Sequence, residues 1–286
     1  MKIKTLPLLL WFIVYFFNLE HSFTQENQEE SNCKDHFDSA RKYFYKDHDS
    51  ALYFTRLIEN TAHAYNNKKC LVIALSCYGT IYRNSGKYHQ SLNAFDSSLT
   101  LFKSLNDSIW EARTILMIGS VYSEKGDYLK SIELLMESSR KYEGLTDEWS
   151  VRSRSRVKNF IGIAYYQLGD KKNALVYFKE SLADSKSLMD TSSFISPLSN
   201  IGMLFSDLGN YSEALKHYEM ARVIAVKTNN YLNEAQIVGN IGNVYFKIGD
   251  YHRSIQNRLQ ALKMVKELNQ SDEITRQYLG IAKSNF

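Results

Sequence analysis

The sequence predicts an all-α fold, a solenoid of antiparallel helix pairs, on two observations. A ten-residue pattern recurs along the chain, in which a glycine is followed three residues later by an aromatic residue and seven residues later by a second glycine. Only two prolines, Pro7 and Pro197, occur in 286 residues, and no Gly/Ser-rich tract divides the interior. A repeat of this kind indicates small helical units that bury a continuous core by stacking on one another.

Five copies of the pattern lie in register over more than half of the chain. They are GTIYRNSGKY from Gly79, GSVYSEKGDY from Gly119, GIAYYQLGDK from Gly162, GMLFSDLGNY from Gly202 and GNVYFKIGDY from Gly242. Their leading glycines are 40, 43, 40 and 40 residues apart. Each copy predicts a first helix, a turn at the second glycine, and the start of a second helix.

The leading glycine of each copy stands inside the first helix of a pair. Glycine costs about 1 kcal/mol relative to alanine there, so we expect the second helix to approach too closely for a side chain. The aromatic residue one turn later is expected to fill the space between the helices, at Tyr82, Tyr122, Tyr165, Phe205 and Tyr245.

The second glycine marks the turn between the two helices. We expect a left-handed cap at Gly86, Gly126, Gly169, Gly209 and Gly249. The next residue is predicted to cap the second helix at Asp127, Asp170, Asn210 and Asp250. That helix continues with a small and then an apolar residue, in the pairs Ser91 and Phe95, Ser131 and Leu135, Ala174 and Phe178, Ala214 and Tyr218, and Ser254 and Leu259.

These copies resemble tetratricopeptide repeats (TPRs), whose signature is a Gly–aromatic first helix, a Gly-Asp-Tyr turn and an Ala-rich second helix. The usual TPR period is about 34 residues. The chain therefore resembles the longer variant found in kinesin light chains, exported bacterial TPR proteins, peptide-sensing bacterial regulators and bacterial sensor regions. The resemblance implies a right-handed superhelix of about six helix pairs, with a concave groove lined by the first helices.

The solenoid is expected to occupy residues 35–286. A degenerate first repeat is predicted at 35–69, the five clear repeats at about 70–272 and a terminal helix at 273–286. That helix is either a cap or the point where a longer sensor has been shortened. The polar segment 25–34 is expected to be disordered.

The first residues have the pattern of a secretory signal peptide. Lys2 and Lys4 precede an apolar run from Leu6 to Phe17, and a polar stretch follows. Residues 1–24 are therefore predicted to direct export to the periplasm or beyond, with an uncleaved N-terminal anchor as the alternative. The run is shorter than the roughly 20 residues that span a bilayer, and no later segment is apolar and long enough to do so.

Composition argues against several other functions. The formal net charge of +4, with signs mixed along the chain, does not predict a nucleic-acid-binding face. The three cysteines, Cys33, Cys70 and Cys77, are odd in number and widely spaced, so neither a disulfide framework nor a metal pair is expected, and all three are predicted to be buried small hydrophobes. The sequence has no HExxH, phosphate-binding glycine loop or GxSxG motif, and its seven histidines are scattered. No enzyme activity, cofactor or metal is predicted.

The resemblance implies that a peptide or protein binds in the groove, where asparagines on the first helices bond the peptide backbone. Asn200 and Asn240 stand two residues before a leading glycine, and Asn243 stands one residue after; Asn159 is displaced by one position. An amide offers a donor and an acceptor together, as a peptide unit does. The alternative is that these residues are exposed or bond neighbouring helices.

Arg113 and Arg156 each lie six residues before a leading glycine and could hold a carboxylate, although the charges around Arg156 also fit a solvated helix end. The predicted function is an extracytoplasmic scaffold for a protein or peptide partner. The alternative is a stand-alone or truncated ligand-sensing region related to TPR-containing histidine kinases or transcriptional regulators. End-to-end stacking of exposed terminal repeats would allow homo-oligomers.

Overall fold

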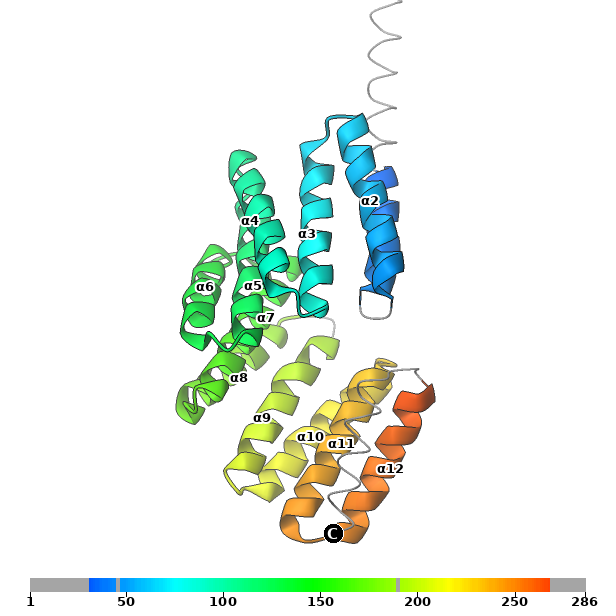
Figure 1. Cartoon of the computed structure of the whole chain (residues 1–286). Coiled ribbons are helices and arrows are strands. Elements are labelled where there is room, and N and C mark those ends of the chain that lie inside the picture. The colour runs from blue at the N-terminus through cyan, green and yellow to red at the C-terminus, as the bar shows by residue number, and fades with distance from the viewer. Residues whose placement is uncertain (1–30, 45–46, 189–190, 268–286) are drawn as a thin grey trace, which may run out of the picture. The chain divides into compact units, whose positions relative to one another are not determined.

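Helices follow one another with short turns throughout the computed structural model, which describes residues 31–44, 47–188 and 191–267 (Figure 1). The described residues hold no strand, which confirms the predicted all-α fold. The predicted signal peptide 1–24 and the terminal helix 273–286 lie outside the described residues. No helix within the described ranges is both long and apolar enough to cross a bilayer.

The chain divides after Val121 into two compact units, and each is described by itself. The first holds helical residues 31–43 and the helices α2 His48–Ala64, α3 Lys68–Asn84, α4 Tyr88–Ser104 and most of α5 Ser108–Glu124. The second holds α6 Tyr128–Lys141, α7 Glu148–Gln167, α8 Lys171–Ser185, the 3-10 turn η1 Thr191–Phe194, α9 Ile195–Asp207, α10 Tyr211–Lys227, α11 Tyr231–Ile248 and α12 Tyr251–Glu267. We call α3, α5, α7, α9 and α11 helices A, and α4, α6, α8, α10 and α12 helices B.

The helices pack as the repeat predicts, each A against the B that follows it in the pairs α3/α4, α7/α8, α9/α10 and α11/α12. A Cβ added to Gly79 would lie 2.6 Å from the Phe95 ring, and one added to Gly162 would lie 2.6 Å from the Phe178 ring. At Gly202 the Cβ would meet the Tyr218 ring at 3.1 Å. The expected close approach of helix B to the leading glycine is therefore confirmed.

The predicted turn chemistry is also confirmed. The second glycines adopt left-handed backbone angles, with φ of +70°, +84°, +82°, +76° and +88° at Gly86, Gly126, Gly169, Gly209 and Gly249. The side chains that follow accept hydrogen bonds from the first turn of helix B, at Asp127, Asp170, Asn210 and Asp250. Three of the predicted aromatics contact helix B directly: Tyr165 stacks on Tyr177 at 5.5 Å between centroids, Phe205 meets His217 at 5.4 Å, and the Tyr245 ring lies 4.5 Å from the Arg253 guanidinium.

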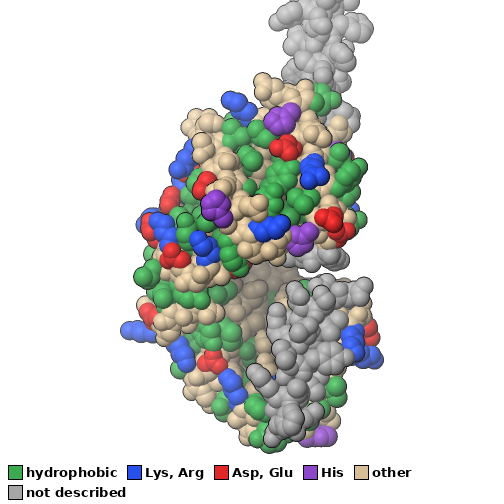
Figure 2. Space-filling model, in the orientation of Figure 1, with side chains coloured by type: hydrophobic (Ala, Val, Ile, Leu, Met, Phe, Trp, Pro, Cys, Tyr) green, Lys and Arg blue, Asp and Glu red, His purple; other side chains and the backbone are tan. Residues whose placement is uncertain are grey.

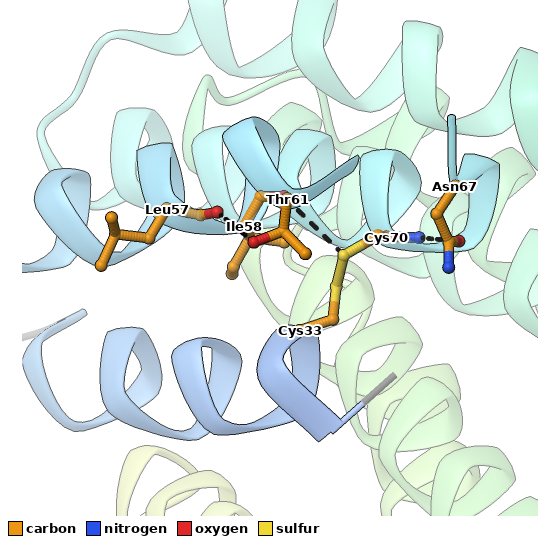
Figure 3. The surroundings of a disulfide bond; sticks show 6 residues. All are labelled: Cys33, Leu57, Ile58, Thr61, Asn67 and Cys70. Atoms are coloured by element: carbon orange, nitrogen blue, oxygen red, sulfur yellow. Dashed lines mark hydrogen bonds between the residues drawn. A yellow bond between two sulfur atoms is a disulfide. The ribbon is translucent and has the colours of Figure 1, made fainter. Parts of the chain in front are cut away.

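The N-terminal end differs from the expectation in two ways. Residues 31–34 are helical rather than disordered, and Cys33 is buried. Cys33 also forms a disulfide with Cys70, with the two Cα atoms 6.0 Å apart (Figure 3). The prediction of three unpaired cysteines was therefore wrong, because the antiparallel return of α2 brings helix 31–43 beside the start of α3. Only Cys77 matches it: its side chain is buried and free, and burial raises the pKa of the thiol to about 12.

Candidate functional site

The asparagines predicted to line a groove are partly brought together. Asn159 lies on α7 and Asn200 on α9, the next helix A, and Nδ2 of Asn200 donates a 2.9 Å hydrogen bond to Oδ1 of Asn159. The one-residue displacement of Asn159 in the sequence therefore does not separate the pair. Asn159 is buried and Asn200 is half-buried. The two amides form a polar link between consecutive helices A.

α11 carries the other two predicted asparagines. Asn240 is half-buried and Asn243 is exposed. Oδ1 of Asn243 accepts a 2.6 Å hydrogen bond from Nη2 of Arg258 on α12. Asn243 therefore bonds a side chain of its own helix pair, which is the alternative considered from the sequence.

Arg258 is a candidate site residue that the sequence reading missed. The sequence pattern pairs Ser254 with Leu259 as the apolar position of α12, and this is wrong, because Leu259 is 49% exposed whereas Arg258 is 4% exposed. A Cβ on Gly242 would lie 2.8 Å from Cγ of Arg258, so the arginine stem packs on the leading glycine. Counting sixteen residues from each leading glycine would have found it, since that count also gives Phe95, Leu135, Phe178 and Tyr218.

The two predicted groove arginines lie in different units, Arg113 in the first and Arg156 in the second. The Arg113 guanidinium lies over the Trp110 ring, 4.6 Å from its centroid. Arg156 is exposed on α7, and its neighbour Arg152 bonds Glu148 at 2.6 Å. The carboxylate-binding patch that these arginines suggest stays a prediction.

A polar cavity of about 510 Å³ opens between α6, α7 and α8, and no sequence motif predicts it. Arg154 holds Asp184 with two hydrogen bonds of 3.2 and 3.3 Å, and Nζ of Lys158 lies 2.9 Å from Asp184. Lys158 stands four residues before its leading glycine, where the other copies have Leu75, Ile115, Leu198 and Val238. Nζ of Lys158 also lies 3.5 Å from Oε2 of Glu180, so these partly buried groups pair two cations with two carboxylates and need no ligand to balance their charge.

A second polar network joins three consecutive helices A near their C-terminal ends. The Asp207 carboxylate on α9 accepts hydrogen bonds from Nζ of Lys247 on α11, at 2.7 Å, and from the hydroxyl of Tyr166 on α7. Burial and the bond to Asp207 raise the pKa of Tyr166 to about 12. Partial burial raises the pKa of Asp207, but the two donated hydrogen bonds outweigh it, so that this pKa lies below 3.8.

The surface carries charges of both signs. Lys and Arg side chains are interspersed with Asp and Glu over the face shown in Figure 2, with apolar side chains between them. Across the described ranges, no group of three or more His, Cys, Asp or Glu side chains has an arrangement that could hold a metal ion.

Sequence comparison gives a family match over more than half of the chain. A family model described as "Tetratricopeptide repeat" matches residues 71–144 and 193–267, and a second model with the same description matches residues 155–183. A curated relative, the 43 kDa receptor-associated protein of the synapse of Tetronarce californica, is 22% identical over 186 residues. That alignment covers 63% of this chain and 43% of the relative, so the chain matches less than half of that protein's length.

Solved structures share the fold at low sequence identity. The Rap conjugation gene regulator of the plasmid pLS20, in complex with the Phr* peptide, matches with a TM-score of 0.63 and 14% identity, over 76% of this chain and 59% of that one. Aspartyl phosphate phosphatase F from Bacillus subtilis matches with a TM-score of 0.65 and 12% identity, over 79% and 59% of the two chains. At these identities the similarity establishes the architecture alone.

Proposed function

Because the chain belongs to the tetratricopeptide-repeat family, we propose that it is a non-catalytic scaffold that binds a peptide or protein partner along its helices A. The Asn159–Asn200 pair is the observation that carries this proposal. The hydrogen bond between them uses one donor and one acceptor, so each amide keeps its other group for a ligand. A peptide unit needs one donor and one acceptor, and this pair offers both at neighbouring helices.

Two observations support an extracytoplasmic location. Residues 1–24 have the charge and hydropathy pattern of a signal peptide. The Cys33–Cys70 disulfide is of a kind that persists in oxidising compartments and is rare where thiols are kept reduced. The two features are independent of each other, and we therefore propose that the protein acts outside the cytoplasm.

The non-catalytic role rests on the sequence rather than on the fold. A phosphatase is among the structures with this architecture, so the same helix array is compatible with catalysis. This sequence has no HExxH, phosphate-binding glycine loop or GxSxG motif. The pKa values that are raised most belong to the buried side chains of Cys77 and Tyr218 and to Tyr78, where partial burial and the hydrogen bond that its hydroxyl donates to Glu59 are the causes.

Capture of partners from an envelope extract tests the proposal. The full-length chain and an Asn200→Ala/Asn240→Ala variant are used as baits, and Asn60→Ala, which removes an exposed amide from α2, is the matched control. We expect a partner that is retained by the wild type and by Asn60→Ala and is lost from the double variant. Retention by the double variant, with all baits melting alike, would place the interface elsewhere.

The second candidate function is a ligand-sensing region related to TPR-containing kinases or regulators. The structural match to a gene regulator in complex with a peptide favours it. A sensor changes conformation when its ligand binds, whereas a scaffold need not. Small-angle scattering of the chain with and without its captured partner peptide separates the two, because a fall in the radius of gyration of the chain is expected only for the sensor.

A further inference from the structure

Arg258 places a positive charge at a position that the other helix pairs fill with apolar or aromatic side chains. Phe95, Leu135, Phe178 and Tyr218 hold this position in the four preceding pairs, and all are buried. An apolar residue of similar length would complete the last pair equally well. Packing alone therefore does not explain why an arginine stands at this position.

The guanidinium group of Arg258 has more hydrogen-bond donors than the acceptors around it. Nη2 donates to Oδ1 of Asn243, and the group lies 5.4 Å from the centroid of the Phe246 ring. Nε and Nη1 are buried and make no hydrogen bond. A buried cation with unmet donors destabilises a fold more than an apolar replacement would. The buried guanidinium therefore has two donor nitrogens, Nε and Nη1, that an acceptor could pair with.

A carboxylate is the acceptor that fits best. The planar fork of a guanidinium binds the two oxygens of a carboxylate side by side. Asn243 is exposed on the proposed binding helix α11, and its amide oxygen already occupies the place of one such oxygen on Nη2. A carboxylate can replace that amide oxygen when the Asn243 side chain turns outward.

We infer that Arg258 is the residue by which this protein recognises a carboxylate on its bound peptide, either an Asp or Glu side chain or the C-terminal carboxylate. The inference rests on the peptide binding proposed above and adds the ligand's chemistry to it. The last helix pair thereby selects acidic peptides, while the asparagines of the earlier helices A hold any peptide backbone.

Three pools of random synthetic octapeptides test this selection on the purified full-length chain. The neutral pool contains Asn and Gln in place of Asp and Glu and has amidated C-termini. One acidic pool differs from it only in containing Asp or Glu at those places, and the other differs from it only in having free C-termini. Arg258→Met removes the cation while keeping an unbranched side chain, and Lys263→Met removes an exposed charge from the same helix as a control. We expect the wild type and Lys263→Met to retain an acidic pool about tenfold better than the neutral pool, and Arg258→Met to retain all three alike.

The outcomes separate this inference from the function on which it rests. Equal retention of all pools by the wild type, or a preference that survives in Arg258→Met, overturns the role of Arg258 and leaves peptide binding intact. Retention of no pool overturns both.

Thermal melting of the free protein provides an independent check. If Arg258 lacks an anion in the free chain, Arg258→Met melts at the same temperature as the wild type or higher. The opposite outcome is that Arg258→Met melts at a lower temperature than the wild type. If Asp272→Asn/Glu273→Gln lowered it equally, and the triple variant melted no lower, the chain's own carboxylates would satisfy Arg258. That result also overturns the inference.

Discussion

Nζ of Lys247 lies 2.7 Å from Oδ1 of Asp207, so that an ion pair joins two consecutive helices A across forty residues of sequence. Both side chains are about one-third exposed, which limits the strength of the pair. We expect Asp207→Asn and Lys247→Met to show a coupling free energy of roughly 0.2–1 kcal/mol in a double-mutant cycle. Urea unfolding of the four chains at pH 7 measures it, and additive effects would mean that the pair contributes nothing.

The same ion pair has a predictable acid dependence. The folded pKa of Asp207 is depressed, so its contribution to stability is present above the unfolded value and is lost as pH falls through the folded value. The stability difference between wild type and Asp207→Asn should therefore shrink below about pH 3.8. A difference that stayed constant from pH 7 to pH 2.5 would show that Asp207 is not stabilised as a carboxylate.

The contribution of Tyr166 to the stability of the fold is predicted to depend on pH in the alkaline range. Its folded pKa is raised to about 12 from 10.0. The stability that Tyr166 contributes is thus fully present below pH 10 and is lost as pH rises through about 12. Melting temperatures of the wild type and Tyr166→Phe, measured from pH 8 to 12, should converge at the alkaline end. Parallel curves would contradict this.

Leading glycines should differ in their tolerance of a methyl group. Alanine is intrinsically favoured over glycine in a helix by about 1 kcal/mol, but the Cβ would lie 2.6 Å from the Phe178 ring at Gly162 and 3.1 Å from the Tyr218 ring at Gly202. We expect Gly162→Ala to destabilise the protein by roughly 1–3 kcal/mol and Gly202→Ala by less. Gly202→Leu should lower the melting temperature by several degrees. Ser212→Ala, an exposed change on α10, is the reference for all three variants.

The Cys33–Cys70 disulfide closes a loop of 37 residues. Its reduction should lower the stability of the first unit by about 2–4 kcal/mol. Dithiothreitol should thus lower the melting temperature of the wild type and of Cys77→Ala by the same amount, and that of Cys33→Ala not at all. A wild-type melting curve unaffected by the reductant would mean that the bond is absent or contributes nothing.

The features that the sequence predicted well are those that local rules determine. A left-handed turn favours glycine, as at Gly86 and Gly249, and a helix start favours a side-chain acceptor such as Asp170. Counting along the repeat was therefore sufficient for the caps and for the helix pairs.

The missed features depend on contacts between elements or on a departure from the pattern. Cys33 and Cys70 are distant in sequence and meet only because α2 reverses the chain direction. Arg258 departs from the apolar pattern of the other copies, and its neighbour Leu259 fits that pattern in the sequence. Asn159, by contrast, looked out of register and yet reaches Asn200, since a side-chain amide can span a displacement of one residue.

The covalent link between helix 31–43 and α3 also determines how the N-terminal end responds to a protease. A single cut at any peptide bond between Cys33 and Cys70 produces two pieces that remain bonded to each other. The nicked protein therefore migrates as one species in non-reducing electrophoresis and separates only after reduction. In an environment rich in proteases, the first helix pair can suffer a break in its backbone without losing the segment that covers the end of the repeat array.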